Sequence, residues 1–519
     1  MEKIFNLLLK NYKKTALVLG LLSGLAFPPT YAFILFIFAF CVALKLVDKL
    51  SSYKKVVVFS YFLGFSYFVA GFYWIGNALL VDIDSFGWIY PLALLSIGAF
   101  FGIFMILPFV VWRYIQQNNV WLRVILFAYV WVLLEWIRSF IFTGFAWNML
   151  GTIFSFNEIF IQTASVCGTY GLSFLALVVT GSFYAFFIQK KKSGIVVFLL
   201  IVSFIIGFGV WRLNKYPNVD SDIKVRLVQP SIAQNMKWKR EELERNFLNY
   251  VNLSKQESLQ TVDFVVWGET ALPFDINYYT EYNEIIKEAI PYNGYLITGV
   301  VRHDVSNGAY RVYNSMYVLN NRADVVDFYD KNHLVPFGEY IPFRKYLPGW
   351  IKPVANNIAE FSIGEKFKNI KLAEYPRFGG LICYEAIFPD DVVNRKNKPD
   401  WLVVLANDGW YGNSSGPYQH LVASQMRAVE EGISIVRSAN SGISAVIDSL
   451  GRIKAQIPLH HKGYVDAYLP KNEIPKTIYS KIGKFGVFTI ILLILLVYYI
   501  QRKVVTRVKY KISVDTNSI

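Results

Sequence analysis

The sequence predicts an α-helical membrane domain of about eight transmembrane helices, joined to one large α/β or α+β domain. Of the 519 residues, 54% are hydrophobic and 17% are aromatic, which is more than an ordinary soluble domain carries. The hydrophobic residues concentrate in blocks long enough to cross a bilayer, for which about 20 apolar residues suffice. The segment 222–475 is instead polar and mixes strand-like with helix-like patterns. These observations indicate a multi-pass membrane protein with one polar domain.

Eight apolar segments account for the membrane-spanning part. Seven of them lie within residues 1–215, which we interpret as an N-terminal membrane domain, and the eighth precedes the tail 501–519. The first two segments are short and flank Pro28-Pro29, so they form either one broken helix or a hairpin. The predicted spans lie near residues 15–29, 31–47, 56–76, 88–112, 121–137, 158–188, 194–212 and 483–500.

Lysine and arginine cluster in alternate loops, and this alternation predicts the orientation. Basic loops remain in the cytoplasm under the positive-inside rule. Because both the N-terminus and the following loop are basic, an even number of crossings separates them, and the first two segments form a hairpin. Both termini are then cytoplasmic, and the segment 222–475 faces outward. The basic segments are 1–14, 45–55, 113–123, 190–193 and 502–519.

The formal net charge of +15 follows from this topology, because the basic loops account for it and the rest of the chain is neutral overall. A basic protein can bind nucleic acid, but here the charge indicates contact with anionic lipid headgroups. We expect membrane lipid and no nucleic acid among the partners. The N-terminal apolar stretch lacks a small-residue cleavage site, so we interpret it as a retained span and not as a signal peptide.

The polar segment is long enough for one domain, and residues 223–230 open it with strand-like alternation. Its five histidines are scattered, and it has neither a metal motif nor a phosphate-binding glycine loop, so we expect no metal and no cofactor. Helical patterns cover 238–255, 280–290 and 417–430, and further strand-like runs cover 263–267, 295–300, 311–319, 324–329, 379–383, 401–406, 433–437 and 443–448.

Three of these strand-like runs are followed by a residue whose side chain can take part in catalysis. One is followed by Glu269, one by Lys331 and one by Cys383, the only cysteine outside a hydrophobic span. A strand that ends in cysteine before a polar turn presents a nucleophile at its tip. An isolated cysteine more often fills a core. A free outward thiol is nevertheless a liability in an oxidising compartment unless it is used.

Glutamate, lysine and cysteine in this order resemble the active site of the carbon–nitrogen hydrolases, the nitrilase superfamily. The whole chain is similar to the bacterial apolipoprotein N-acyltransferase family, and its most specific motif is the block 329–342 around Lys331. Two mild departures are Ala146, where the family usually has proline, and Thr270, where it often has serine. Further matching stretches are 135–138, 144–147, 228–232, 237–238, 267–273, 382–385, 407–412 and 427–442.

The resemblance implies a four-layer αββα sandwich for 222–475 and a role for each member of a triad. Glu269 would take the proton of the Cys383 thiol, whose usual pKa of about 8.5 leaves it mostly un-ionised at neutral pH. Lys331 would stabilise the thiolate and the oxyanion, together with the backbone N–H that follows the cysteine. Glu339 would hold the Lys331 ammonium; alternatively it is an exposed loop carboxylate.

Three further residues are expected at the substrate. Trp238 and Tyr384 resemble family residues that line the path of the lipid, although Trp238 could equally pack on the surface. Glu385 would tune the nucleophile or orient an acceptor amine, or else make a structural hydrogen bond at a turn. The apolar stretch 346–351 is either a membrane-dipping lid or an internal wall. Asn407, Asp408, Trp410, Arg437 and Asn440 receive no role beyond shaping the pocket or the fold.

The family's reaction would transfer an acyl chain from a phospholipid to the α-amine of the S-diacylglyceryl cysteine of an apolipoprotein, through a thioester. We expect a monomer in the bacterial cytoplasmic membrane. An anchored amidase that uses water as acceptor would need the same triad, so the sequence leaves that alternative open. A transporter should carry charges inside its spans, whereas Glu135 and Arg138 lie near an outward end, where we interpret them as an interface pair. A catalytically dead scaffold should lack a triad residue, and every triad position is filled.

Overall fold

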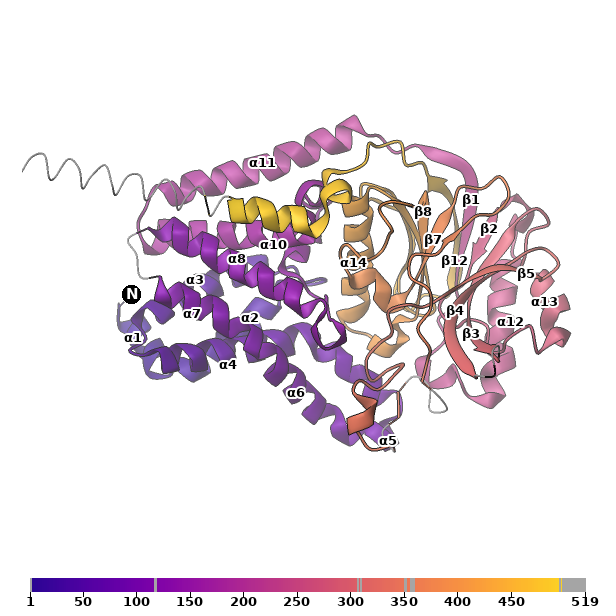
Figure 1. Ribbon diagram of the computed structural model, residues 1–519, viewed down its shortest axis with the longest axis horizontal. Helices are drawn as coiled ribbons and strands as arrows, with labels where there is room; N and C mark the ends of the chain where they lie inside the picture. The colour runs from indigo at the N-terminus through magenta and orange to yellow at the C-terminus, as the bar shows by residue number, and fades with distance from the viewer. Residues whose placement is uncertain are drawn as a thin grey trace, which may run out of the picture.

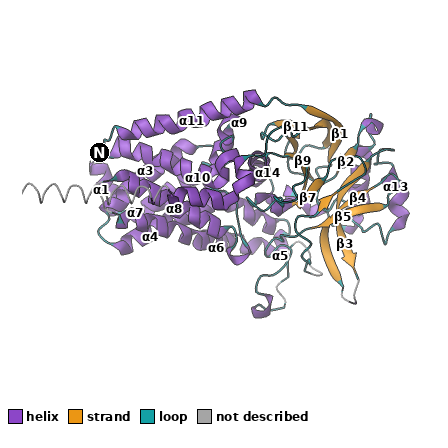
Figure 2. Ribbon diagram, turned by 45° about the horizontal axis from the view of Figure 1, so that its top comes forward, coloured by secondary structure: helices purple, strands orange, loops and turns teal. Residues whose placement is uncertain are grey.

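The helices and strands separate into two halves of the molecule. The computed structural model describes residues 2–115, 119–305, 308, 310–349, 352–354, 360–493 and 496. Helices fill the N-terminal half, and the two sheets lie beyond α14 on the other side (Figures 1 and 2). The predicted tail 501–519 and the end of the predicted span 483–500 lie outside the described residues.

Five described helical segments are long and apolar enough to cross a membrane: Tyr53–Leu80, Ile83–Tyr114, Val120–Arg138, Ala164–Ile188 and Ser193–Lys215. Together with α2, α3 and the helix at 478–493 they confirm the predicted helical membrane domain. The α-helices of this half are α1 (Glu2–Lys10), α2 (Tyr12–Gly24), α3 (Phe33–Lys49), α4 (Tyr53–Phe72), α5 (Ile83–Phe86), α6 (Tyr90–Gly102), α7 (Ile106–Tyr114), α8 (Val120–Arg138), α9 (Glu158–Ile161), α10 (Ala164–Phe183) and α11 (Ser193–Lys215).

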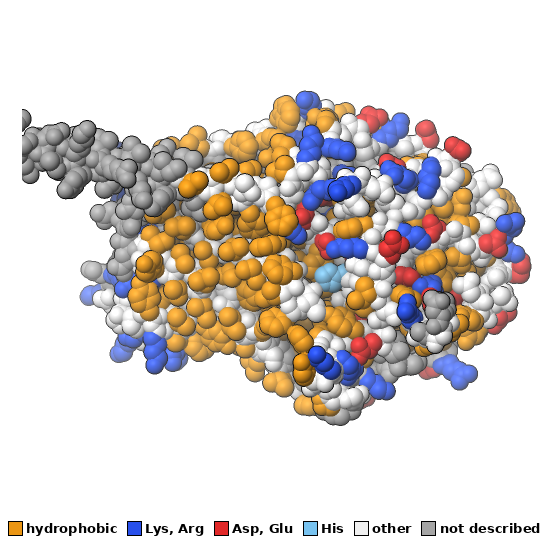
Figure 3. Space-filling model, in the orientation of Figure 1, with side chains coloured by type: hydrophobic (Ala, Val, Ile, Leu, Met, Phe, Trp, Pro, Cys, Tyr) orange, Lys and Arg blue, Asp and Glu red, His pale blue; other side chains and the backbone are white. Residues whose placement is uncertain are grey.

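The C-terminal helix returns to the membrane domain. Phe488 packs on both Trp136 of α8 and Tyr170 of α10, with ring centroids 5.4 and 5.7 Å apart. In the space-filling view, apolar side chains cover the helical half, whereas charged side chains gather over the sheets and at the end that holds α1 (Figure 3). An apolar belt between two charged zones is what a bilayer-spanning domain requires.

Two six-stranded mixed sheets form the centre of the second half. Their strand orders are β12-β1-β2-β3-β4-β5 and β11-β10-β9-β8-β7-β6. In the second sheet β7, β8 and β9 are parallel, and every residue of β7 and β8 is buried. Such strands have continuous apolar runs because both faces are covered. The strands are β1 (Asp220–Gln229), β2 (Phe264–Val266), β3 (Tyr295–Asp304), β4 (Arg311–Leu319), β5 (Val325–Asp330), β6 (Asn369–Ile370), β7 (Phe378–Ile382), β8 (Trp401–Ala406), β9 (Ser434–Ala439), β10 (Ser444–Ile447), β11 (Ile453–Ile457) and β12 (Gly463–Pro470).

Helices cover the outer faces of both sheets. A cluster that includes Phe264 and Phe378 fills the space between the sheets. Phe247 of α12 (Leu243–Ser254) and Ile286 of α13 (Asn283–Lys287) pack on the first sheet. Ala428 of α14 (Gly416–Glu431) packs on the second sheet. The predicted four-layer αββα sandwich is therefore confirmed.

Helix α14 also joins the sandwich to the membrane domain, since it lies between the two in Figure 1. Near its N-terminal end, Gln419 Oε1 accepts hydrogen bonds of 2.9 Å from both Trp74 and Trp147 of the membrane domain. Near its C-terminal end, Glu430 Oε1 accepts from the backbone N–H and the hydroxyl of Thr169, at 2.6 and 2.7 Å. Thr169 follows Gly168, whose φ of 63° breaks the regular helix of α10.

Candidate active site

Cys383 sits at a strained turn between strand and helix. It follows β7 directly, begins the 3₁₀ helix η13 (Cys383–Ile387) and has a φ of 51°. A left-handed conformation is costly for a residue with a Cβ and persists where the surroundings fix it, often at functional sites. The side chain is only 4% exposed, and its Sγ lies 4.0 Å from the Tyr411 hydroxyl. This geometry would suit a nucleophile at the tip of a strand.

Glu269, Lys331 and Glu339 meet in one buried cluster. Lys331 Nζ lies 3.5 Å from Glu269 Oε1 and 3.0 Å from the Glu339 carboxylate. Lys331 continues β5, and Glu339 is held by the backbone N–H of Val335, which donates to Oε2 at 2.8 Å. Because Glu339 is only 4% exposed, the alternative of an exposed loop carboxylate is wrong.

Asn314 completes this cluster, and no pattern in the sequence had pointed to it. Its Nδ2 donates to Glu269 Oε1 and to Glu339 Oε1, each at 2.8 Å. Glu269 Oε1 is thereby occupied, whereas Glu269 Oε2 has no hydrogen-bond partner among the described residues although it is buried. A buried acceptor without a partner is uncommon and has a functional explanation when it lies in a reactive site. Oε2 is the oxygen free to receive a proton.

The charges in the site set the protonation of the nucleophile and its cation. Burial, followed by the Glu269 carboxylate, raises the pKa of the Cys383 thiol, and Lys331 and the backbone N–H of Asn407 oppose this shift. Burial alone would lower the pKa of Lys331, but Glu339 and Glu269 raise it above its usual value. The resting site therefore holds a neutral thiol and a permanent ammonium, so that Cys383 needs a base and Lys331 cannot be that base.

Lys237 holds the backbone at Glu269 and Thr270. Its Nζ donates to the Glu269 carbonyl oxygen at 2.8 Å and to Thr270 Oγ1 at 2.7 Å. Thr270 has a φ of 46°, so this lysine secures a second strained turn next to a reactive residue. Burial lowers the pKa of Lys237 to about 8, and the nearby Glu269 and Cys383 limit that shift. The sequence marked Lys237 only as part of a motif.

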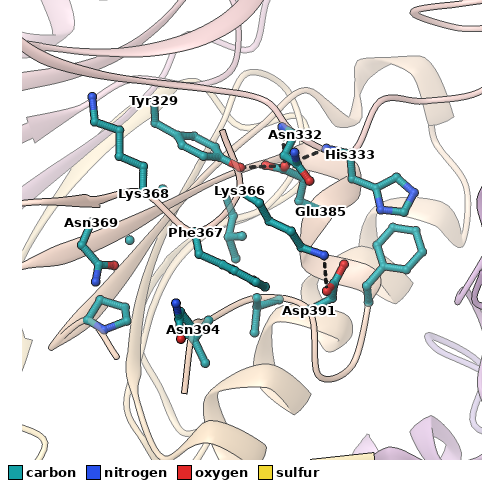
Figure 4. Close-up of a pocket in the computed structure, with 17 residues that line it drawn as sticks. Tyr329, Asn332, His333, Lys366, Phe367, Lys368, Asn369, Glu385, Asp391 and Asn394 are labelled. Atoms are coloured by element: carbon teal, nitrogen blue, oxygen red, sulfur yellow. Dashed lines mark hydrogen bonds and ion pairs between the residues drawn. The ribbon is translucent and has the colours of Figure 1, made fainter. Parts of the chain in front are cut away.

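The Glu385 carboxylate accepts hydrogen bonds from the protein around the turn that holds Cys383. Its Oε1 accepts from the Tyr329 hydroxyl and from the backbone N–H groups of Asn332 and His333, at 2.8 to 3.0 Å (Figure 4). Its Oε2 accepts from the backbone N–H of Ile382 at 2.7 Å. Glu385 thus ties the turn after Lys331 to the turn at Cys383. The structural alternative, a hydrogen bond at a turn, describes these contacts.

The cavity beside Glu385 does not extend the site. It has a volume of about 20 Å³ and is lined by residues from three segments, 329–333, 366–369 and 379–399 (Figure 4). Lys366 and Asp391 form an ion pair of 2.5 Å across it. This space is about that of one water molecule and is too small for an acyl chain.

Tyr384 and Trp238 occupy different surroundings. Tyr384 is 4% exposed, and its hydroxyl donates to the Gly144 carbonyl oxygen of the membrane domain at 2.7 Å. Trp238 is 42% exposed beside Lys237, whose Nζ lies 5.8 Å from the indole ring. Tyr384 therefore contributes to the boundary between the two halves, and Trp238 to the surface near Glu269.

Exposed aromatic side chains mark the junction of membrane domain and sandwich. Phe142 and Phe343 are 61% and 59% exposed, and their ring centroids are 6.4 Å apart. Tyr346, at the start of the predicted lid or wall 346–351, is 73% exposed, which argues against an internal wall at that residue. Trp350 and Ile351 lie outside the described residues.

Asn407 and Asn440 belong to a buried polar framework, whereas Trp410 is half-buried. Asn407 Nδ2 donates to Gln234 Oε1 at 2.8 Å, and Asn440 Nδ2 donates to the Ile232 carbonyl oxygen at 2.9 Å. Both satisfy groups that would otherwise be buried without partners. Among the described residues no three His, Cys, Asp or Glu side chains gather as metal ligands do.

Comparison with known proteins agrees with this geometry. Residues 19–182 match the family model of the apolipoprotein N-acyltransferase N-terminal domain, and residues 224–479 match that of the carbon–nitrogen hydrolases. The chain is 37% identical to the apolipoprotein N-acyltransferase of Rickettsia typhi over 93% of this chain and 97% of that protein. It is 39% identical to that of Rickettsia bellii, over 95% and 98%, and 35% identical to that of Brucella melitensis, over 90% and 92%. The family resemblance noted in the sequence is thus confirmed: the chain belongs to the apolipoprotein N-acyltransferase family.

Proposed function

We propose that the protein transfers an acyl chain from a membrane phospholipid to the α-amine of the S-diacylglyceryl cysteine that begins an apolipoprotein. Membership in the family supports lipoprotein N-acylation. The observation that carries the proposal for this chain is that its membrane domain forms part of the wall around the nucleophile. The ring centroid of Trp147 lies 5.5 Å from that of Tyr411, whose hydroxyl is 4.0 Å from Cys383 Sγ.

A membrane domain at this position fits a lipid donor. Moving one methylene group from the bilayer into water costs about 0.8 kcal/mol. A phospholipid must therefore bring its ester to the thiol without exposing its acyl chains to water. Trp74, Trp147 and Tyr384 provide apolar surface between the bilayer and Cys383, and all three are less than 5% exposed. A water-soluble amide would need no such wall.

In the first half-reaction Glu269 Oε2 takes the thiol proton as Cys383 Sγ attacks the ester carbonyl carbon. Lys331 and the backbone N–H of Tyr384 stabilise the oxyanion. The tetrahedral intermediate collapses to a thioester, and the proton held by Glu269 passes to the leaving alkoxide, which departs as lysophospholipid. The Glu339 carboxylate lies 3.0 Å from the Lys331 ammonium and keeps it in position.

In the second half-reaction the neutral α-amine attacks the thioester carbonyl and gives a proton to Glu269. The thiolate leaves and recovers that proton. An α-amine has a pKa of about 7.7–8.0, so a useful fraction is neutral near physiological pH. The site thus uses one base twice and requires no metal or cofactor for either step.

The proposal extends to the placement of the chain. This is a bacterial membrane protein. We place residues 1–215 and 483–500 in the cytoplasmic membrane, the domain 222–475 on its outer side, and both termini with the tail 501–519 in the cytoplasm, and we expect a monomer. The charge alternation of the loops supports this orientation.

Stepwise mass spectrometry tests the function. The purified protein in nanodiscs containing phosphatidylethanolamine should acquire one acyl group on Cys383 and release one lysophospholipid. Addition of an S-diacylglyceryl cysteinyl peptide should move that acyl group to the peptide amine. Release of free fatty acid at the same rate with and without the peptide would instead identify a hydrolase that uses water.

A further inference from the structure

A buried chain of three polar side chains ends on the backbone of the nucleophile. Arg437 Nη2 donates to Asp408 Oδ2 at 2.8 Å, and Asp408 Oδ1 lies 2.6 Å from His420 Nδ1. His420 Nε2 lies 2.9 Å from the carbonyl oxygen of Cys383. His420 and Arg437 are fully buried and Asp408 is 1% exposed, so water does not compete for these contacts.

The direction of the last hydrogen bond is fixed by chemistry. A carbonyl oxygen only accepts, so His420 Nε2 carries a hydrogen and donates it to Cys383. Asp408 is ionised at neutral pH, because Arg437 and His420 outweigh the effect of burial and lower its pKa to about 2. Its carboxylate holds the Arg437 guanidinium, whose Nη2 also lies 3.1 Å from His420 Nδ1. Burial and Arg437 lower the pKa of His420, so the ring carries one hydrogen, and with that hydrogen on Nε2 the other nitrogen accepts from Arg437. The remaining lone pair faces Arg437 and not the thiol, so His420 does not act as the base for Cys383.

The Cys383 carbonyl belongs to the same peptide group as the N–H of Tyr384. That N–H is near the start of η13, where the first backbone donors have no partner within the helix. It is the group that the proposed mechanism assigns to the oxyanion. A donor on the carbonyl side of a peptide withdraws charge through the amide resonance and strengthens the donor on the nitrogen side, and such chains are cooperative in a dry environment.

We propose that His420 is a positioning residue that orients and polarises the Cys383–Tyr384 peptide, and so strengthens the oxyanion donor of both half-reactions. The inference rests on the proposed function, and it assigns to Asp408 and Arg437 the task of holding His420. The membrane domain contributes as well, because the Trp147 ring covers His420 at 5.2 Å between centroids.

Two variants separate the two ring contacts. In His420→Gln the side-chain amide reaches about the position of Nε2 and can still donate to the Cys383 carbonyl. In His420→Asn the amide stands near Nδ1, so it keeps the contact with Asp408 and loses the one with Cys383. We expect His420→Asn to slow thioester formation and acyl transfer by about tenfold each, with KM unchanged, and His420→Gln to remain within about threefold of the parent. Loss of an oxyanion donor itself costs at least about 100-fold.

Alkylation of Cys383 by iodoacetamide distinguishes polarisation from displacement, because that reaction passes through no oxyanion. The alkylation rate of His420→Asn should stay within about twofold of the parent at the same pH. A parallel fall in alkylation would show that His420 only places the sulfur, and would overturn the inference. Equal acyl-transfer rates for His420→Asn and the parent would also overturn it. If the parent itself forms no thioester on Cys383, it is the proposed function that fails.

Discussion

The side-chain amide of Asn314 donates a hydrogen bond of 2.8 Å to Glu269 Oε1, and through the same nitrogen it reaches Glu339. One neutral donor thereby holds two carboxylates around one ammonium, and it leaves Glu269 Oε2 without a partner among the described residues. A buried arrangement of this kind depends on each partner, since removal of one leaves an uncompensated charge.

Replacement of Asn314 should therefore impair the base. Asn314→Asp brings a third carboxyl group against Glu269 and Glu339, and thioester formation should fall about 100-fold, the size of effect expected for a misplaced catalytic group. Acyl-enzyme yield after a short incubation with phospholipid measures this. Asn277→Asp is a suitable control, since Asn277 Nδ2 contacts Asp275 at a buried carboxylate elsewhere in the domain. Normal thioester formation in Asn314→Asp would contradict the assigned contact.

Cys383→Ala should give a folded, membrane-inserted protein that forms no acyl-enzyme. Cys383→Ser should behave in the same way, because a serine hydroxyl is far less acidic than a thiol and Glu269 is too weak a base for it. The loss of transfer to a diacylglyceryl peptide should reach about 10⁴-fold or more. Continued N-acylation by Cys383→Ala would mean that another residue is the nucleophile.

Glu269→Gln and Lys331→Ala should fail before the thioester forms, because one removes the base and the other the cation that faces the oxyanion. Glu339→Ala should be damaging but less absolute, since Lys331 keeps its contact with Glu269 at 3.5 Å. Intact-protein mass spectrometry follows the acyl adduct in all three. A normal adduct yield in Glu269→Gln or Lys331→Ala would remove that residue from the first half-reaction.

The raised pKa of Cys383 predicts how its alkylation depends on pH. Since burial and Glu269 disfavour the thiolate, its fraction and the alkylation rate should rise about tenfold per pH unit from pH 6 to 9 without a plateau. In Glu269→Gln the charge that raises this pKa is gone, so alkylation should be faster at every pH while acyl transfer is lost. A plateau near pH 7 in the parent would indicate a preformed thiolate.

Single-cysteine reporters test the orientation in a variant that lacks Cys41, Cys167 and Cys383. An impermeant maleimide should label Gln256→Cys in intact spheroplasts, and Ser51→Cys only after permeabilisation, because both parent residues are exposed and the proposed orientation places them on opposite sides of the membrane. Ser254 would not serve, since it is fully buried and accepts from Trp267 Nε1 at 2.8 Å. The reverse labelling pattern would contradict the outward domain.

The sequence predicted the inner strands of both sheets and the edge strand β5, and it missed the edge strands β6, β11 and β12. The runs at 379–383 and 401–406 became β7 and β8 because their continuous apolar residues fill a core. The edge strand β6 has only two residues, and in β11 exposed and half-buried positions alternate. Their composition matches that of loops, and the pairing that makes them strands is not local. The expected helix 280–290 shrinks to α13, Asn283–Lys287.

At the site, the sequence pointed to residue types that often act in catalysis. It missed residues that matter because of the side chains and backbone groups they contact in the folded protein. Glutamate, lysine and cysteine at strand ends point to catalysis. Asn314 lies within a strand, and His420 lies on a helix that has an ordinary amphipathic pattern. Only the pairing of strands and the packing of α14 bring them to Glu269 and to Cys383, so no spacing along the chain could reveal them.

The break in α10 has a consequence for how the protein is made. Thr169 is bonded by Glu430, which lies 261 residues later in the chain. When α10 leaves the ribosome, Glu430, whose carboxylate will accept the hydrogen bond from the Thr169 backbone N–H, has not yet been synthesised. In the proposed orientation Glu430 must then be exported and folded on the far side of the membrane. In that orientation, the helices of residues 1–215 enter the membrane before the acceptor for Thr169 exists, and this contact forms only when the exported domain docks on them.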